Sequence, residues 1–141
     1  MTVHQISIFV ENKYGKLCEI LALLAGEQIR IIAATVADTS EYGILRLIVS
    51  DPQRAYRILK AHNVGANLTD VLAIAAPPSA GSFVQTLSAF TRSGLSVEYM
   101  YCFSLNGKSI LILRTNSLEA ALEVVRHQHL EYLSEACLMD L

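Results

Sequence analysis

Apolar and polar residues follow two different spacings near the start of the chain, and these predict a strand and then a helix. From position 5 to position 10 they alternate, which is typical of a half-buried strand. After a polar loop, apolar side chains recur at the 0, 3, 4 and 7 offsets of one helical face, at Leu17, Ile20, Leu21 and Leu24. Gly26 is the predicted end of this helix.

Further elements complete the pattern of this first segment. Residues 29–37 and 44–49 are rich in β-branched and aliphatic side chains and predict a hairpin. A helix follows, with Ser50 or Asp51 as its cap and a proline in its first turn. Residues 68–76 predict a closing strand, so the order is βαββαβ.

The same order recurs in the second half of the chain. A helix predicted to end at Gly94 leads to strands at 95–103 and 109–114, which flank Asn106-Gly107, a dipeptide typical of a tight hairpin. A helix capped by Asn116 or Ser117 follows. Residues 135–141 then predict a short last strand.

The spacing of the two segments indicates an internal duplication. Gly15 and Gly81 are 66 positions apart, and Asp51 and Asn116 are 65 apart. We therefore expect an α+β fold made of two ferredoxin-like βαββαβ repeats, residues 1–70 and 71–141. Each repeat is expected to form an antiparallel sheet with its helices on one face.

The predicted third strands, 44–49 and 109–114, carry apolar residues on both faces. Exposing a whole second face forfeits more free energy than a domain can spare, so association through sheet faces, as a homodimer, is predicted. The second strands, 29–37 and 95–103, are long apolar edges, and such edges favour pairing. We expect these edges to join side by side within one chain into an eight-stranded sheet.

Composition narrows the function classes. The 141 residues are 52% hydrophobic and 17% charged, with a net charge of −2 and no run of either sign, which disfavours nucleic-acid and membrane-surface binding. No membrane-length apolar stretch and no secretory signal is found in the sequence, so the predicted location is cytoplasmic.

Candidate catalytic and metal-binding groups are sparse. Cys18, Cys102 and Cys137 stand in apolar surroundings, which is typical of reduced core thiols. His127 and His129 lack a nearby carboxylate or thiol set, so neither a metal site nor a cofactor is expected. Because the sequence contains no nucleophile elbow, phosphate loop or dinucleotide fingerprint, an enzyme is disfavoured.

The loop before the first helix combines a glycine with lysines. Gly15 precedes a helix whose first N–H groups are unsatisfied and carry positive partial charge, so this end can receive a carboxylate. The glycine either leaves room for a ligand beside the backbone or only permits a tight turn.

The run from Ile8 to Leu17, with a helix after it, resembles the opening of ACT domains. These are small regulatory modules whose signature is a strand, a polar or proline-containing loop and then Gly-x-Leu. Tyr14 stands where many members have proline. The second repeat keeps the proline and glycine but has Phe83 in place of the leucine. The resemblance extends over the whole chain through the repeated βαββαβ order.

The resemblance implies a non-catalytic sensor that binds a small molecule, typically an amino acid, where the loop of one domain faces the second strand of its neighbour. One implied site consists of Asn12, Lys13, Tyr14, Gly15, Lys16 and Leu17, facing Ser96, Val97 and Glu98. A second possible site consists of Pro78, Ser79, Ala80, Gly81, Ser82 and Phe83, against Arg30, Ile31 and Ile32. The first is favoured because its lysines and backbone N–H groups suit a carboxylate. Such a stand-alone sensor is expected to act through a partner enzyme of amino-acid metabolism.

Two alternatives remain open. The first alternative is a purely structural dimer without a ligand. The second is a tandem RNA-recognition module, which has the same βαββαβ order. For the latter, Tyr99, Tyr101 and Phe103 form an alternating aromatic stripe that is able to stack on bases. Against it, the third strands lack the Arg/Lys-Gly-aromatic signature and the net charge is negative.

Overall fold

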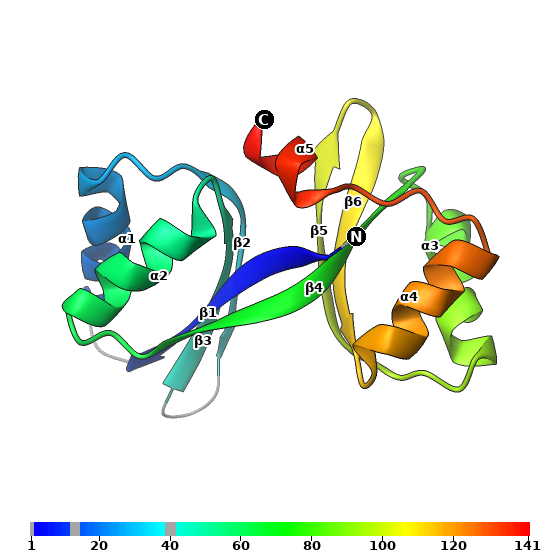
Figure 1. Ribbon diagram of the computed structural model, residues 1–141, viewed down its shortest axis with the longest axis horizontal. Coiled ribbons are helices and arrows are strands. Elements are labelled where there is room, and N and C mark those ends of the chain that lie inside the picture. Colours follow the sequence, from blue (N-terminus) through cyan, green and yellow to red (C-terminus); the bar gives the residue numbers. More distant parts are fainter. Residues whose placement is uncertain (1, 12–14, 39–41) are drawn as a thin grey trace. The chain divides into compact units, whose positions relative to one another are not determined.

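A computed structural model describes residues 2–11, 15–38 and 42–141 of the chain. The strands and helices of this part follow the order βαββαβαββαα (Figure 1). In chain order they are β1 (Val3–Glu11), α1 (Lys16–Gly26), β2 (Ile31–Asp38), β3 (Tyr42–Val49), α2 (Pro52–Ala61), β4 (Ala66–Ala76), α3 (Ala80–Arg92), β5 (Val97–Leu105), β6 (Lys108–Thr115), α4 (Leu118–His127) and α5 (Glu135–Met139).

The chain divides into two compact units. The first unit comprises His4–Thr69 together with Ala136–Leu141. The second unit comprises Asp70–Glu135 together with Thr2 and Val3. Strand β4 therefore contributes its first residues to the first unit and its remaining residues to the second.

The first unit is an antiparallel sheet with both of its long helices on one face. Strand β3 pairs with β1 on one side and with β2 on the other. The N–H group of Phe9 in β1 donates to the carbonyl oxygen of Gly65, just before β4, over 3.1 Å. Ile6 and Ile8, two positions apart in β1, are buried with residues of α1 and α2, as strand periodicity requires (Figure 1).

The second unit repeats this plan with a different fourth strand. The second part of β4 pairs with β6, and β6 pairs with β5, both antiparallel. On the other side of β4, the N–H group of Ala75 donates to the carbonyl oxygen of Glu131, and that of Leu133 donates to the carbonyl oxygen of Ala73, each over 2.8 Å. The residues around Tyr132 thus take the edge position that a fourth strand holds in the ferredoxin-like plan.

Local sequence explains how the helices and the second hairpin form. Asp51 and Ser117, rather than their neighbours, cap α2 and α4 by accepting hydrogen bonds from backbone N–H groups in the first turn. Asn106 and Gly107 both have positive φ, 51° and 79°, which confirms the predicted tight turn between β5 and β6.

The expected eight-stranded sheet is wrong. Among the described residues, hydrogen bonds join six strands in the order β2-β3-β1-β4-β6-β5. The two apolar edge strands, β2 and β5, are therefore at opposite ends of this order rather than paired with each other. The reason is that β4 serves both repeats: its eleven residues close the first unit and open the second.

The short last strand expected at 135–141 is also wrong, because Glu135–Met139 form helix α5. Its sequence, Glu-Ala-Cys-Leu-Met, contains Ala, Leu, Met and Glu, which favour helix, and no β-branched residue. Leu138 of α5 is 1% exposed. The helix belongs to the first unit although its sequence follows the second repeat.

In each unit the sheet face that points away from the two long helices is exposed to a different degree. Ile110 and Ile112 of β6 are buried and lie directly opposite Phe103 and Tyr101 of β5. In the first unit, by contrast, Phe9 is 53% exposed and lies opposite Ile44. Tyr42 on the same face is also 53% exposed, so Phe9, Ile44 and Tyr42 form a partly exposed apolar patch at this end of β1 and β3, beside the charged Glu11.

Candidate functional site

The site predicted at the first loop begins at the N-terminus of α1. Asn12, Lys13 and Tyr14 lie outside the described residues. Gly15 is the N-cap of α1 with φ 79° and ψ −5°, and no side chain of the described residues caps this end. A side chain is rarely stable at this φ, which explains the glycine. A Cβ atom added at Gly15 would meet no heavy atom within 4 Å, so the space beside its backbone is open.

Lys16 adds a mobile positive charge to this helix end. Its Nζ lies 3.4 Å from a carboxylate oxygen of Glu19, one turn further along α1. The two side chains are 44% and 69% exposed, respectively. Because an ion pair this open to water contributes at most about 1 kcal/mol, a ligand can replace either partner at little cost in free energy.

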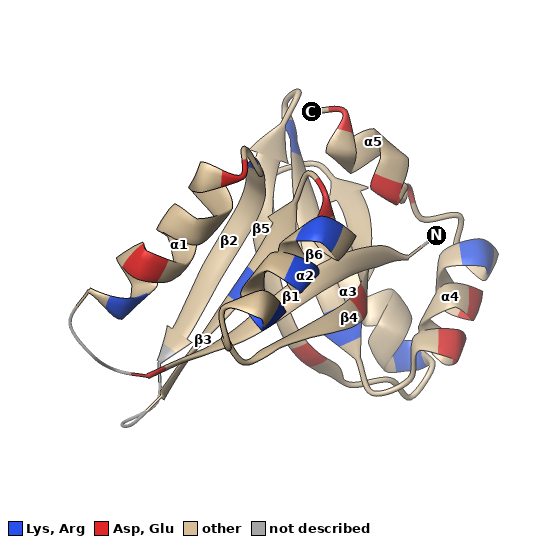
Figure 2. Cartoon of the chain, turned by 60° about the vertical axis from the view of Figure 1, so that its left-hand side comes forward, with Lys and Arg blue, Asp and Glu red and all other residues tan. Residues whose placement is uncertain are grey.

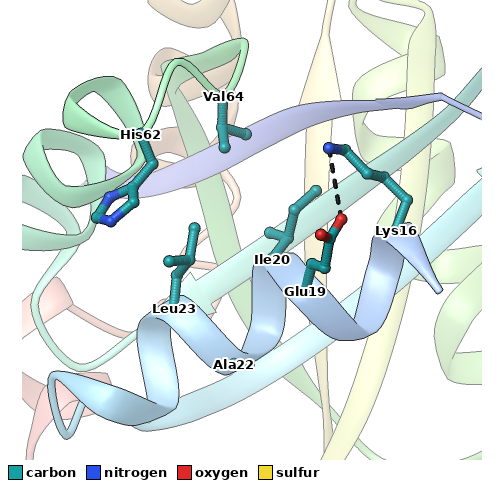
Figure 3. Close-up of a pocket in the computed structure, with 7 residues that line it drawn as sticks. All are labelled: Lys16, Glu19, Ile20, Ala22, Leu23, His62 and Val64. Carbon is teal, nitrogen blue, oxygen red and sulfur yellow. Dashed lines mark ion pairs between the residues drawn. The ribbon is translucent and has the colours of Figure 1, made fainter.

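Lys16 also lines a groove between α1 and the connection from α2 to β4 (Figure 3). Its volume is about 420 Å³. The residues around it come from α1 and from the connection between α2 and β4, and they are Lys16, Glu19, Ile20, Ala22, Leu23, His62 and Val64. Charged groups stand at the Lys16 end, whereas Ile20, Leu23 and Val64 make the middle apolar. A groove with an apolar wall and a few polar groups is typical of small-molecule sites.

His62 stands at the end of the groove away from Lys16 (Figure 3). Its Nδ1 lies 2.9 Å from the carbonyl oxygen of Ile58. A carbonyl oxygen only accepts, so Nδ1 is the donor in this contact.

Leu17, the last residue of the predicted loop, contributes to the core rather than to the open space around Gly15. It is half-buried and packs against the core of the first unit, which includes Ile20 and Leu24 of the same helix. We conclude that Leu17 anchors the start of α1, while Gly15 and Lys16 face open space.

The second predicted loop differs from the first at the helix N-terminus. Ser79 caps α3, accepting a hydrogen bond from the N–H group of Ser82 over 3.2 Å. Gly81 lies inside α3 at ordinary helical φ, and Phe83 packs against the core of the second unit. Pro78 and Ala80 are exposed. This helix end is therefore already satisfied by a side chain, and the described loop offers no cation.

The strand residues of the two predicted sites already have partners within their own units. The N–H group of Ser96 donates to Asn116 Oδ1 over 3.0 Å, and Glu98 lies 3.3 Å from Arg114 in an ion pair. Arg30 donates from its guanidinium group to carbonyl oxygens of Met139 and Leu141. Val97, Ile31 and Ile32 are half-buried or exposed strand residues. That any of these strand residues contacts a ligand stays a prediction.

The apolar part of the groove was missed by sequence reasoning. Lys16, Glu19, Ile20 and Leu23 recur at the 0, 3, 4 and 7 offsets of one helical face, a signal present in the sequence. His62 and Val64 carry no such signal, because only the fold brings the end of α2 alongside α1.

The sequence predicted that the three cysteines lie in the core, and this prediction is wrong. Cys18, Cys102 and Cys137 form no disulfide in the described part of the chain, and each is exposed. Cys18 is on α1, and Cys102 is on β5, which stands at one end of the strand order found among the described residues. An apolar sequence context therefore did not translate into burial at these positions.

The charged residues of the described helices are distributed unevenly. Figure 2 shows acidic and basic residues together on α1 and α4, whereas α2 carries basic residues alone, Arg54, Arg57 and Lys60. In the described part of the chain, His, Cys, Asp and Glu do not gather in groups of three that suit a metal ion. Every helix there is too short or too polar to cross a bilayer.

The whole chain, residues 1–141, matches the sequence model of the ACT domain pair. The chain belongs to the ACT domain pair family. Protein BT0572 from Bacteroides thetaiotaomicron, a crystal structure, is 36% identical with a TM-score of 0.94, over 100% of this chain and 98% of that one. The match to the family model confirms the resemblance to ACT domains that the sequence indicated.

Two solved structures of lower identity share the fold. The regulatory subunit of aspartate kinase from Thermus thermophilus is 18% identical with a TM-score of 0.62, over 88% of this chain and 91% of that one. The corresponding subunit from Thermus flavus is 18% identical with a TM-score of 0.61, over 92% and 94% of the two chains. No curated protein matches the sequence.

Proposed function

We propose that this ACT domain pair is a non-catalytic regulatory protein that binds an amino-acid effector at the loop and helix N-terminus of its first repeat. The observation that carries the proposal is the contrast between the two helix ends. Helix α1 starts at Gly15 without a side-chain cap and beside Lys16, whereas α3 is capped by Ser79. The open, cationic end is the one suited to a carboxylate.

Two sources of positive charge at the N-terminus of α1 favour the binding of a carboxylate there. Backbone N–H groups in the first turn of α1 and the positive end of the helix dipole favour an anion. Lys16 adds a full charge, and hydrogen bonds from a cation to a carboxylate are stronger than those between neutral groups. Glu19, at 3.4 Å from Lys16, is placed to receive the ammonium group of the same ligand.

The regulatory part of the proposal is supported by the family and by its solved members. The two Thermus proteins of this fold are regulatory subunits of aspartate kinase. We extend the proposal to a partner enzyme of amino-acid metabolism in the cytoplasm, on which the effector acts through this chain.

The protein is further proposed to form a homodimer through the sheet face of its first unit that points away from α1 and α2. Phe9 and Tyr42 are each 53% exposed there, close to Ile44 on the same face. Association removes this apolar patch from water, which is the main driving force for such contacts.

The experiment for the effector is thermal unfolding of the intact chain with each of the twenty amino acids at millimolar concentration. A bound ligand at one hundred times its Kd stabilises the folded state by about 2.7 kcal/mol, which raises the melting temperature measurably. We expect a rise with at least one amino acid, and a smaller rise in Lys16→Gln.

Lys108→Gln is the matched control, because Lys108 also forms an exposed ion pair, with Glu131, outside the groove. Its ligand-induced rise should equal that of the unaltered chain. If no amino acid changes the melting temperature, the effector proposal is wrong and the purely structural dimer becomes the better reading.

A further inference from the structure

We infer that the groove along α1 receives the side chain of the effector, and that the effector is therefore an α-amino acid with an aliphatic side chain, such as leucine, isoleucine, valine or methionine. The inference rests on the proposed function and adds the ligand class to it. It is carried by the order of charged and apolar residues along the groove.

The charged end of the groove matches the backbone of an amino acid. Lys16 and Glu19 present one positive and one negative group 3.4 Å apart. A zwitterion has the complementary pair, with its carboxylate for Lys16 and its ammonium group for Glu19. Both protein groups are solvent-exposed, so exchanging their mutual contact for two contacts with the ligand loses little.

The groove beyond this end is apolar. Ile20 is 2% exposed and Leu23 and Val64 are half-buried, and all three line it (Figure 3). From Lys16 to Leu23 the helix rises about 10 Å, which accommodates a side chain of three or four carbons beyond the ligand's α-carbon. Because its middle carries no charged group, a ligand with a charged side chain would lose water there without gaining a partner.

The volume of the groove sets a lower limit on the size of the ligand's side chain. The groove holds about 420 Å³, so a methyl side chain leaves most of its apolar wall in contact with water. Each further methylene buried in an apolar pocket raises affinity about fourfold until the pocket is filled. We therefore expect leucine to bind at least about tenfold more tightly than alanine.

The test is calorimetric titration of the intact chain with L-leucine, L-alanine, L-aspartate and L-lysine. Ala22→Leu is the test variant, since Ala22 is an exposed residue at the groove and leucine favours helix, so the fold is retained while the groove is narrowed. Ala25→Leu is its matched control, an exposed alanine of the same helix that does not line the groove.

We expect Ala22→Leu to weaken leucine binding about tenfold and to leave alanine binding unchanged, while Ala25→Leu changes neither. If leucine binds equally well to Ala22→Leu, the side chain does not occupy the groove and the inference is overturned. If aspartate or lysine binds and leucine does not, the ligand class is wrong while the proposed function stands. If no amino acid binds, the proposed function itself has failed.

Discussion

Arg30 holds Met139 across 109 positions of sequence, through a hydrogen bond of 2.8 Å from Nη2 to the carbonyl oxygen. Nη1 of the same guanidinium group donates to the carbonyl oxygen of Leu141. The backbone of Arg30 is itself fixed, because its N–H group donates to Ser50 Oγ and its carbonyl oxygen accepts from the N–H group of Ser50, each over 2.9 Å. A single side chain at the start of β2 thus satisfies carbonyl groups at the end of α5.

Replacing Arg30 by methionine should loosen α5 without unfolding the unit. Two hydrogen bonds from a charged donor are lost at an exposed position, which we expect to lower the local stability by about 1 kcal/mol. The amide of Asp140, which donates to the carbonyl oxygen of Ala136, should exchange its hydrogen about fivefold faster. Arg92→Met, at the end of α3, is the control. If hydrogen exchange at Asp140 is the same in Arg30→Met as in the unaltered chain, other contacts, such as the burial of Leu138, hold α5 in place.

Gly15→Ala should lower the free energy of unfolding by about 1 kcal/mol, because an alanine at φ 79° is strained. Gly81→Ala should instead raise it by about 0.5 kcal/mol, since Gly81 lies in α3 at ordinary φ and its added Cβ meets nothing. Urea unfolding measures both. Equal effects of the two substitutions would contradict the different backbone roles assigned to the two glycines.

Ser79→Ala should lower the free energy of unfolding by about 1 kcal/mol, because the cap of α3 is lost. It should leave the affinity for the effector unchanged, since the proposed site is at α1. Chemical unfolding and titration with the bound amino acid measure the two quantities. A loss of binding in this variant would place the effector at the second loop instead.

Phe9→Ser should convert the proposed dimer to a monomer with little change in folding, because Phe9 is 53% exposed within one chain. Sedimentation velocity over a range of concentrations gives the mass. Val84→Ser, at an exposed apolar residue of α3, is the control and should stay dimeric. A dimer that survives Phe9→Ser would show that another surface joins the copies.

Hydrophobic spacing predicted most of the fold, because helix and strand periods are set locally. Leu17, Ile20 and Leu24 do bury one face of α1, and the hairpin at Asn106 forms as its dipeptide requires. The end of the chain was predicted wrongly because apolar content was given more weight than helix propensity, although Glu135–Met139 contain no β-branched residue.

The candidate site was predictable only in part, for a similar reason. Gly15 and Lys16 were found from a local motif, and their open surroundings fit the predicted role. The apolar wall needed Val64 beside α1, a contact that tertiary folding alone creates. The exposed position of Cys102 likewise depends on which strand becomes the sheet edge, which strand order decides and local sequence does not.

Calorimetric titration of L-leucine into the unaltered chain and into Lys16→Gln tests the central claim most directly. We predict saturable binding to the unaltered chain and at least about tenfold weaker binding to the variant, because the carboxylate loses its charged partner. Equal affinity of the two proteins, or no binding of leucine or any other amino acid at millimolar concentration, would contradict an effector site at the N-terminus of α1.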